Sequence, residues 1–295
     1  MTHRPGLDAN AAHSARMYDY YLGGKDNYPV DQQAADAVKL VFPHIEYAAR
    51  TNRAFMVRAV RYLAEQGVDQ FLDIGTGLPT EPNLHQVVQS VVPRARVLYV
   101  DNDPIVLTHA RALLTSTPAG RTAYLDADLT RPESILNAPE LSATLDLSRP
   151  VALSLIAILH FIGDHHRPYE LVNTLLSAFA EGSYVLITHA TGDFDPKGTA
   201  AAAEVYRNRG IEVRTRTRDE IARFFTGLDL IEPNITPPHR WHPAEPEPEL
   251  RLTSTERSEP STGTSFRDKR VSFYSAVARV PARTAGQRPG EQAQQ

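Results

Sequence analysis

A short stretch of the chain places a carboxylate beside two glycines, a combination that can hold a ligand. Residues 70–77 read Q-F-L-D-I-G-T-G, so a run of β-favouring apolar residues reaches Asp73 and then meets Gly75 and Gly77. Because glycine has no Cβ, the chain can turn sharply there and a ligand can approach the backbone closely. The pattern predicts a buried strand followed by a binding loop.

A second acidic stretch lies further along the chain. Residues 97–103, V-L-Y-V-D-N-D, form another apolar run that ends in Asp101 and Asp103, and residues 83–92 between the two stretches are typical of a helix. This strand–helix–strand order brings carboxylates to the carboxyl ends of two parallel strands. Ligands of open parallel sheets bind at that edge, so the two stretches predict a nucleoside site.

The loop after Asp73 is poorly suited to a phosphate. It lacks the Gly-Lys-Ser/Thr of a P-loop, and Thr80 stands where a dinucleotide fingerprint needs its third glycine. Pro79 and Pro82 remove backbone N–H donors, and Glu81 adds negative charge. A cationic ligand without phosphate suits these residues better. S-adenosylmethionine, which carries a sulfonium and an ammonium, is such a ligand.

The elements that must position these residues alternate regularly between strand and helix. The hydrophobic pattern predicts seven strands, at residues 70–75, 96–102, 123–129, 151–159, 183–188, 229–233 and 271–278. It predicts helices at residues 83–92, 104–114, 132–137, 169–180, 197–209 and 218–225. Alternation with short connections favours an α/β fold, a mostly parallel sheet with helices on both faces.

The chain before the first strand has a different pattern. Residues 14–66 contain three helical segments, the first with Ser14 as its expected N-cap, and they predict a helical cap or lid over the carboxyl edge of the sheet. We expect residues 67–280 to form the binding domain. Residues 243–270, rich in Pro, Glu, Ser and Thr, are expected to be a mobile insertion. The ends, residues 1–13 and 281–295, are expected to be flexible.

Composition excludes several functional classes. The chain of 295 residues has no cysteine, which rules out disulfides, thiolate metal sites and a cysteine nucleophile. Its net charge of −4, without a block of Lys or Arg, argues against a nucleic-acid partner. No signal peptide is evident at the start, and the most apolar run, residues 151–159, is too short to cross a bilayer. We expect a cytoplasmic protein with no membrane partner, and the oligomeric state stays open.

Several motifs resemble those of class I S-adenosylmethionine-dependent methyltransferases. They are D-I-G-T-G at residues 73–77, V-D-N-D at 100–103, A-D-L at 127–129 and A-I-L-H-F at 157–161. The chain more specifically resembles the actinobacterial S-adenosyl methyltransferase family, formerly catalogued as a domain of unknown function, over residues 12–280. Motifs at residues 16–28, 49–55, 183–190 and 239–241 carry this closer resemblance. The 243–270 insertion is longer than expected for the family.

The resemblance implies a Rossmann-like seven-stranded sheet whose last strand is antiparallel. It also implies S-adenosylmethionine as cofactor and S-adenosylhomocysteine as product. In the first motif, Asp73 would orient the methionine amino group, while Gly75, Thr76 and Gly77 would wrap the methionyl-ribose part.

The later motifs supply the rest of the implied cofactor site. Asp101 would accept hydrogen bonds from both ribose hydroxyls, with Asn102 beside it. Asp128 would accept from the adenine amine and Leu129 would offer its backbone N–H to a ring nitrogen. Ala157 would flank the transferring methyl group.

Strand-end acids also have a simpler explanation, since such residues often cap the next helix. Asp103, which precedes Pro104, fits an N-cap, and Asp101 could be one too. Asp126 lies two residues before Asp128 and could be the side chain that faces outward instead.

The helical cap offers a second group of candidates. Its aromatic and basic residues could form a lid over the cofactor; they are Tyr18, Tyr21, Lys25 and Tyr28. Arg53, or Arg50, could pair with the methionine carboxylate. The alternative is that the tyrosines pack between helices and that the arginines are solvated.

His160 is the candidate catalytic residue, because a neutral imidazole at the end of an apolar strand could take a proton from the acceptor. It could also be a packing histidine, and His189 raises the same choice. Residues 164–166, D-H-H, are read as a solvated loop, so no metal site is expected.

These observations favour methyl transfer to an oxygen, nitrogen or carbon atom of a small-molecule acceptor, by in-line displacement that needs alignment more than a base. Three alternatives stay open at this point: a protein that binds the cofactor without turnover, an NAD-dependent oxidoreductase, and a nucleic-acid methyltransferase.

Overall fold

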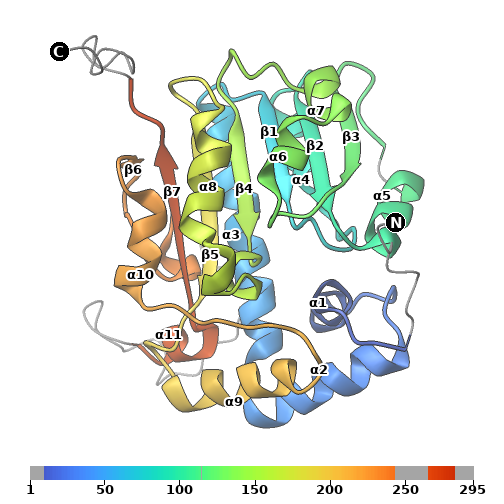
Figure 1. The fold of residues 1–295 in the computed structure, drawn as a ribbon, viewed down its shortest axis with the longest axis vertical. Helices are drawn as coiled ribbons and strands as arrows, with labels where there is room; N and C mark the ends of the chain where they lie inside the picture. The colour runs from blue at the N-terminus through green and yellow to red at the C-terminus, as the bar shows by residue number, and fades with distance from the viewer. Residues whose placement is uncertain (1–9, 114, 243–264, 283–295) are drawn as a thin grey trace, which may run out of the picture.

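A seven-stranded sheet forms the centre of the protein (Figure 1). In the computed structural model, residues 10–113, 115–242 and 265–282 are described. The strand order is β3-β2-β1-β4-β5-β7-β6, and β7 runs antiparallel to both of its neighbours. The strands are β1 (Gln70–Ile74), β2 (Arg96–Asp101), β3 (Arg121–Asp126), β4 (Ala152–Ile156), β5 (Tyr184–Ala190), β6 (Asp229–Leu230) and β7 (Phe273–Arg279). The predicted, mostly parallel α/β sheet is confirmed.

Helices cover both faces of this sheet, because its strands are apolar on both sides. On β1, Phe71 packs with α3 (Ile45–Glu65) and α4 (Leu84–Val91), whereas Leu72 points to the opposite face. The other helices on or beside the sheet are α5 (Pro104–Leu113), α6 (Pro132–Leu136), α7 (Pro139–Thr144), α8 (Pro168–Ser177) and α10 (Arg218–Ala222). Proline opens several of these helices, as its fixed φ and missing N–H allow.

A helical cap lies at the carboxyl edge of the parallel strands (Figure 1). It contains α1 (Ser14–Leu22), α2 (Pro29–Val41) and also α9 (Pro196–Arg207), a helix from between β5 and β6. Met17, Val38, Phe42 and Ala202 are buried in the core that these helices share. The division predicted at residue 67 therefore separates segments that packing joins, since the later half of α3 belongs to the core of the sheet.

Several predicted boundaries were wrong for local reasons. Strand β4 ends at Ile156, three residues earlier than predicted, because Ala157 adopts a positive φ of 56° and residues 159–161 form a 3-10 turn, η1 (Leu159–Phe161). Strand β3 ends at Asp126 rather than at residue 129. Helix α7 was not predicted. The N-cap of α1 is His13 rather than Ser14, as its Nδ1 accepts from the Ala15 N–H at 3.3 Å.

The mobile insertion predicted for residues 243–270 extends too far at its C-terminal end. Helix α11 (Phe266–Val271) occupies its last residues, with a capping box between Ser265 and Asp268. Asp268 is buried and pairs with His239 at 3.3 Å and with Arg240. The rest of that prediction, at residues 243–264, lies outside the described residues, as do those for residues 1–9 and 283–295.

Two further observations concern the periphery. Residues 10–13, predicted to be flexible, include His13, whose backbone N–H donates to Asp31 at 2.9 Å. Within the described ranges, no helix combines the length and apolarity needed to span a bilayer.

Candidate functional site

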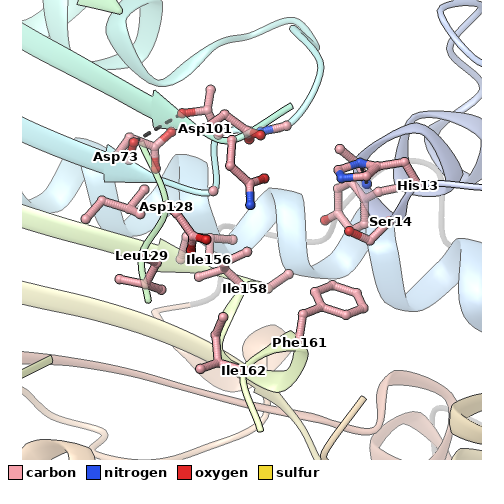
Figure 2. Close-up of a pocket in the computed structure, with 18 of the residues that line it drawn as sticks. His13, Ser14, Asp73, Asp101, Asp128, Leu129, Ile156, Ile158, Phe161 and Ile162 are labelled. Atoms are coloured by element: carbon pink, nitrogen blue, oxygen red, sulfur yellow. Dashed lines mark hydrogen bonds between the residues drawn. The ribbon is translucent and has the colours of Figure 1, made fainter. Parts of the chain in front are cut away.

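A cleft of about 220 Å³ opens between the carboxyl edge of the sheet and the cap. Figure 2 shows Asp73, Asp101 and Asp128 on the sheet side, His13 and Ser14 on the cap side, and Phe161 and Ile162 along the remaining wall. All of the predicted cofactor residues except Lys25 line this cleft. They are Tyr18, Arg53, Asp73, Gly75, Thr76, Gly77, Asp101, Asn102, Asp128, Leu129 and Ala157.

The glycines make the loop after β1 possible. Gly75 and Gly77 have φ values of +74° and +67°, which an L-residue adopts only with strain. A Cβ on Gly75 would lie 2.7 Å from the Ile158 side chain, so this glycine permits a close approach between two loops. A Cβ on Gly77 would meet nothing within 4 Å and would project into open space. The loop therefore offers bare backbone to a ligand at Gly77.

Asp101 joins the two acidic stretches. Its Oδ2 accepts the Gly77 N–H and its Oδ1 accepts the Asp103 N–H, both at 2.9 Å. Burial raises the pKa of this carboxyl above its ordinary value, although the two N–H donors oppose the shift. A carboxylate offers about four acceptor positions, so Asp101 can still accept from a ligand.

Asp73 is the second acid on the sheet side. Burial raises its pKa to about 6, and the nearby Asp101 adds to this effect, while the Ser154 hydroxyl and Arg53 oppose it. Two acids with raised pKa values in one cleft favour a cation as the missing partner. The residues present therefore fit S-adenosylmethionine better than they fit a diphosphate.

Arg53 lines the cleft and also holds the loop that follows β1. Its Nη2 donates to the backbone carbonyls of Thr80 and, at 2.9 Å, of Pro82, so one edge of the guanidinium holds the loop after β1. Its Nε is buried without a hydrogen-bond partner among the described residues. Arg50, the alternative, is exposed and lies outside the cleft lining.

The choice between Asp126 and Asp128 is settled by where β3 ends. Asp126, its last residue, is exposed and does not line the cleft. Asp128 lies in the following loop, is half-buried in the cleft wall, and accepts the Thr130 N–H through Oδ1 at 2.8 Å. The backbone beyond the strand returns Asp128 and Leu129 to the sheet edge.

Only one of the four predicted lid residues reaches the cleft. The Tyr18 ring lines it, while its hydroxyl donates to the Ala49 carbonyl at 3.0 Å and accepts from Asn52 at 2.8 Å. Tyr21 is buried inside the cap. Tyr28 packs against Ile105 and Val106 at the start of α5. Lys25 is exposed and is not among the cleft residues.

Asp103 has two roles, and the sequence predicted only the first of them. Its Oδ1 accepts the Ile105 N–H at 2.9 Å, which confirms the predicted N-cap. Its Oδ2 lies 3.2 Å from the His13 Nδ1 and 3.9 Å from the Arg16 Nη1, and Arg16 also contacts Asp31 at 3.0 Å. These contacts, in which Arg16 is the cation between Asp31 and Asp103, fasten the cap to the sheet.

Comparison with known proteins decides the family. A model of the S-adenosyl methyltransferase family matches residues 1–281. The chain belongs to the S-adenosyl methyltransferase family. Two solved structures are similar over nearly the whole methyltransferase. A DUF574 family protein from Streptomyces avermitilis shares 48% identity over 93% of this chain and 99% of its own, with a TM-score of 0.85. A candidate methyltransferase from Thermobifida fusca shares 38% over 94% and 98%, with a TM-score of 0.81.

No curated protein matches the chain. The family match makes this protein an S-adenosylmethionine-dependent methyltransferase whose acceptor is unidentified. The same match confirms the predicted cofactor.

His160 does not line the cofactor cleft. The side chain is buried with 6% exposure, and burial, together with Arg216, lowers its pKa to about 3. Such an imidazole is a weak proton acceptor near pH 7. The prediction that His160 acts as the catalytic base gains no support from this position.

His189 and Arg216 instead brace the wall of the methyltransferase cleft. The His189 Nδ1 lies 2.8 Å from the Ala190 carbonyl, which makes it the N–H donor, so the Nε2 accepts from the Arg216 Nη1 at 2.9 Å. Arg216 also donates to the carbonyls of Leu159 and Ile162, each at 3.0 Å. This arginine therefore fixes the loop after β4.

Some cleft residues were missed by the sequence analysis. They include His13, Ser14, Met56, Ile158, Phe161 and Ile162. Met56 could have been found, because it lies one helical turn after Arg53 on α3. Phe161 stands next to His160 in the same motif, and only the 3-10 turn decides which of the two faces the cleft.

The D-H-H segment lies at the surface near Glu212. The His165 Nδ1 is 3.5 Å from the Glu212 Oε1, and the ligand atoms of His165, His166 and Glu212 lie within 4.8 Å of one another. His165 and Glu212 are exposed. The reading of this segment as a solvated loop stays a prediction.

Proposed function

We propose that the cleft binds S-adenosylmethionine along the β1–β2 edge and that the methyl group passes to a small molecule. The observation that carries this proposal is the pair of acids, Asp73 and Asp101, which line one cleft from adjacent strands with raised pKa values. A bound cation would stabilise both in their ionised form.

Each acid has a distinct task under this proposal. Asp73 accepts from the ammonium of the methionine part. Asp101 accepts from the ribose hydroxyls with the lone pairs that Gly77 and Asp103 leave available. Asp128 accepts from the adenine amine, with the Leu129 N–H beside it, and Asn102 also lines the cleft.

The chain contributes alignment and exclusion of water rather than acid–base chemistry. When bound, S-adenosylmethionine supplies a methyl group on a positively charged sulfur and becomes S-adenosylhomocysteine. Ala157 and Ile158 lie at the end of β4 beside the glycine loop, where they can border the reacting atoms. Tyr18 of the cap roofs the cleft, and its hydroxyl is fixed by Ala49 and Asn52. Such positioning is the main requirement of a displacement at an activated carbon.

A small-molecule acceptor is favoured over a nucleic acid. The net charge is −4, and the cap covers the carboxyl edge where a polymer would have to lie. The loop after β1 lacks the patterns that bind phosphate, which also argues against NAD. A cytoplasmic location stays a prediction that cell fractionation would test.

Calorimetry with S-adenosylmethionine, S-adenosylhomocysteine and NAD tests the proposal. We expect both adenosyl compounds to bind and NAD to bind far more weakly, and tighter binding of NAD would overturn the assignment. Formation of S-adenosylhomocysteine in an acceptor screen distinguishes turnover from binding alone.

Asp101→Ala tests the ribose contact directly. We expect the affinity for S-adenosylhomocysteine to fall by about 1–3 kcal/mol, because buried ribose hydroxyls would lose their partner. Asp126→Ala is the matched control: this acid lies beside Asp101 in the sheet register but is exposed and outside the cleft. Equal affinities of the two variants would remove Asp101 from the site.

A further inference from the structure

A second cavity lies next to the cofactor cleft. It has a volume of about 70 Å³ and lies between the cap helix α9, the turn η1 and the start of β7. Phe161 lines both this cavity and the cofactor cleft, so the two spaces lie side by side at this residue. Nothing in the proposed cofactor contacts uses this second cavity.

The wall of the cavity is apolar and uncharged. Phe42, Ile45, Ala203 and Phe273 supply much of it, and no Asp, Glu, Lys or Arg is found among the described residues that line it. Most polar groups in the wall already have partners: the Thr199 hydroxyl donates to the Asp195 carbonyl at 2.6 Å. A charged guest would lose its hydration without gaining a counter-ion there, so the cavity selects an uncharged group.

His160 is the exception among these lining residues. It packs edge-on against Phe273, with ring centroids 5.4 Å apart, and lies 4.3 Å from the ring of Phe161. Its Nδ1 is buried with no hydrogen-bond partner among the described residues, and no other described residue of this wall has such an orphaned side-chain atom. A buried polar group without a partner is rare and needs an explanation. The neutral imidazole has one donor and one acceptor nitrogen. The Nε2, which is not among the fully buried side-chain atoms, is the nitrogen that a guest can reach.

We propose that this second cavity anchors the methyl acceptor, and that the acceptor is an uncharged molecule with an apolar group that fits the cavity and a polar group that hydrogen-bonds to His160. The cavity is about half the size of the 150 Å³ engineered cavity that binds benzene, so it takes a branched alkyl group or part of a ring. The rest of the acceptor extends past Phe161 toward Ala157 in the cofactor cleft. His160 recognises the acceptor and is not the base.

This inference rests on the proposed function, because the anchored molecule is taken to be the acceptor. The tests separate the two. Calorimetry with S-adenosylhomocysteine reports on the cofactor cleft alone, whereas small probes report on the second cavity. Loss of cofactor binding with intact probe binding would defeat the proposed function, and the converse would defeat the present inference.

The first experiment uses two probes of nearly equal shape, isobutyramide and isobutyrate. The full chain, labelled at histidine, is titrated both free and in the presence of S-adenosylhomocysteine while the His160 ring signals are followed by NMR. We expect a saturable shift with isobutyramide and at least tenfold weaker binding of isobutyrate. Equal binding of the two probes, or no shift with either at 100-fold excess, would overturn the inference.

Two variants locate the binding. Ala203→Leu fills the cavity and is expected to lower the isobutyramide affinity at least tenfold. Since it could disturb α9, Val213→Leu, at a lining residue outside that helix, provides a second filling variant. His160→Phe keeps the ring but removes both nitrogens and should abolish the preference for the amide. His166→Phe is the matched control, on the same loop but outside the cavity. Unchanged probe affinity in both filling variants, each shown to be folded by its S-adenosylhomocysteine binding, would contradict the inference.

The last experiment concerns turnover. Candidate acceptors are screened in pairs that differ only by amide against carboxylate, with S-adenosylhomocysteine formation as the readout. We expect the neutral member of each active pair to be preferred, and Ala203→Leu to raise its KM about tenfold with kcat nearly unchanged, as loss of an anchoring contact predicts. Preference for the carboxylates, or an unchanged KM, would overturn the inference.

Discussion

The two halves of the carboxyl edge of the sheet carry opposite chemistry. At the ends of β1 and β2, Asp73 and Asp101 line the cleft and have raised pKa values. At the ends of β4 and β5, His160 and His189 are buried and have lowered pKa values. Burial causes both shifts, because it disfavours charge whatever its sign.

The halves differ in whether the protein itself completes them. Arg216 places its charge among carbonyls, His189 and Asp164, whose Oδ1 lies 2.7 Å away. Among the residues that the structure describes, neither acid of the other half has an ion pair of this kind; Arg53 acts on Asp73 and His13 on Asp101 only as weaker influences on their pKa. In the β4–β5 half, the protein itself therefore supplies the polar partners. In the β1–β2 half, a ligand must supply the partner of the two acids.

The largest expected effect comes from removing Arg216 from the β4–β5 half. Arg216→Ala should lower the free energy of unfolding by about 3 kcal/mol, because it leaves two buried carbonyls and the His189 Nε2 without their donor. Chemical denaturation measures the change. Arg214→Ala is the control, since Arg214 pairs with the same Asp164 but is 41% exposed; it should cost about 0.5 kcal/mol. Similar losses in both variants would show that burial does not set the two halves apart.

The next prediction tests the half that a ligand completes. Asp73 has a pKa of about 6 in the free protein, and a bound ammonium favours its ionised form. Affinity for S-adenosylmethionine should thus be constant well above pH 6 and fall up to about tenfold per pH unit below it. Asp73→Asn should bind about tenfold more weakly at pH 7 and lose this dependence. Calorimetry between pH 4.5 and 7.5 measures both, and a flat wild-type profile would contradict the contact.

A smaller effect concerns the same residue without ligand. A carboxyl whose pKa is raised on folding destabilises the folded state above that pKa, and this cost disappears below the unfolded value near 4. The shift from 3.8 to about 6 sets an upper bound of about 3 kcal/mol, and solvent in the open cleft reduces it. Asp73→Asn should therefore raise the stability of the ligand-free protein at pH 7 by about 1 kcal/mol and leave it unchanged near pH 3. Thermal melts at the two pH values report this, with Asp126→Asn expected to change neither. A destabilised Asp73→Asn would mean that the acid already has its partner.

The smallest expected effect is the loss of stability when His13 is removed from the cap. His13→Ala removes the N-cap of α1 and the contact with Asp103, and should cost about 0.5–1 kcal/mol of stability. Because His13 faces the cofactor half, bound S-adenosylhomocysteine should lessen that cost. His109→Ala, which removes a comparable surface contact with Asp26, is the control. An equal cost with and without ligand would place His13 outside the binding half.

The cofactor half could be predicted from the sequence because its signals are local. Asp73, Gly75 and Gly77 follow one strand within a few residues, and the turn that they form is dictated by the glycines themselves. Asp128 lines the cleft although β3 ends three residues earlier than predicted, since the loop brings the residue back to the edge.

The other half depends on contacts that sequence spacing does not show. Arg216 meets Leu159 and Ile162 across more than fifty residues, and no local pattern marks that pairing. His160 does not line the cofactor cleft, because Ala157, with its positive φ, ends β4 early and a 3-10 turn follows. The place of α9 in the cap likewise follows from long-range packing.

That α9 shares one core with α1 and α2 restricts how molecules enter and leave. No described residue of α9 lines the cleft, but α9 packs against α1 and α2 of the cap, so these two helices cannot swing on a single hinge near the amino end without separating from it. Exchange of product for fresh substrate requires either that both segments move as one body or that Met17 and Ala202 part and expose the interior between them. Either movement costs more than lifting a lone helix, and release of product is therefore a natural bottleneck of the catalytic cycle.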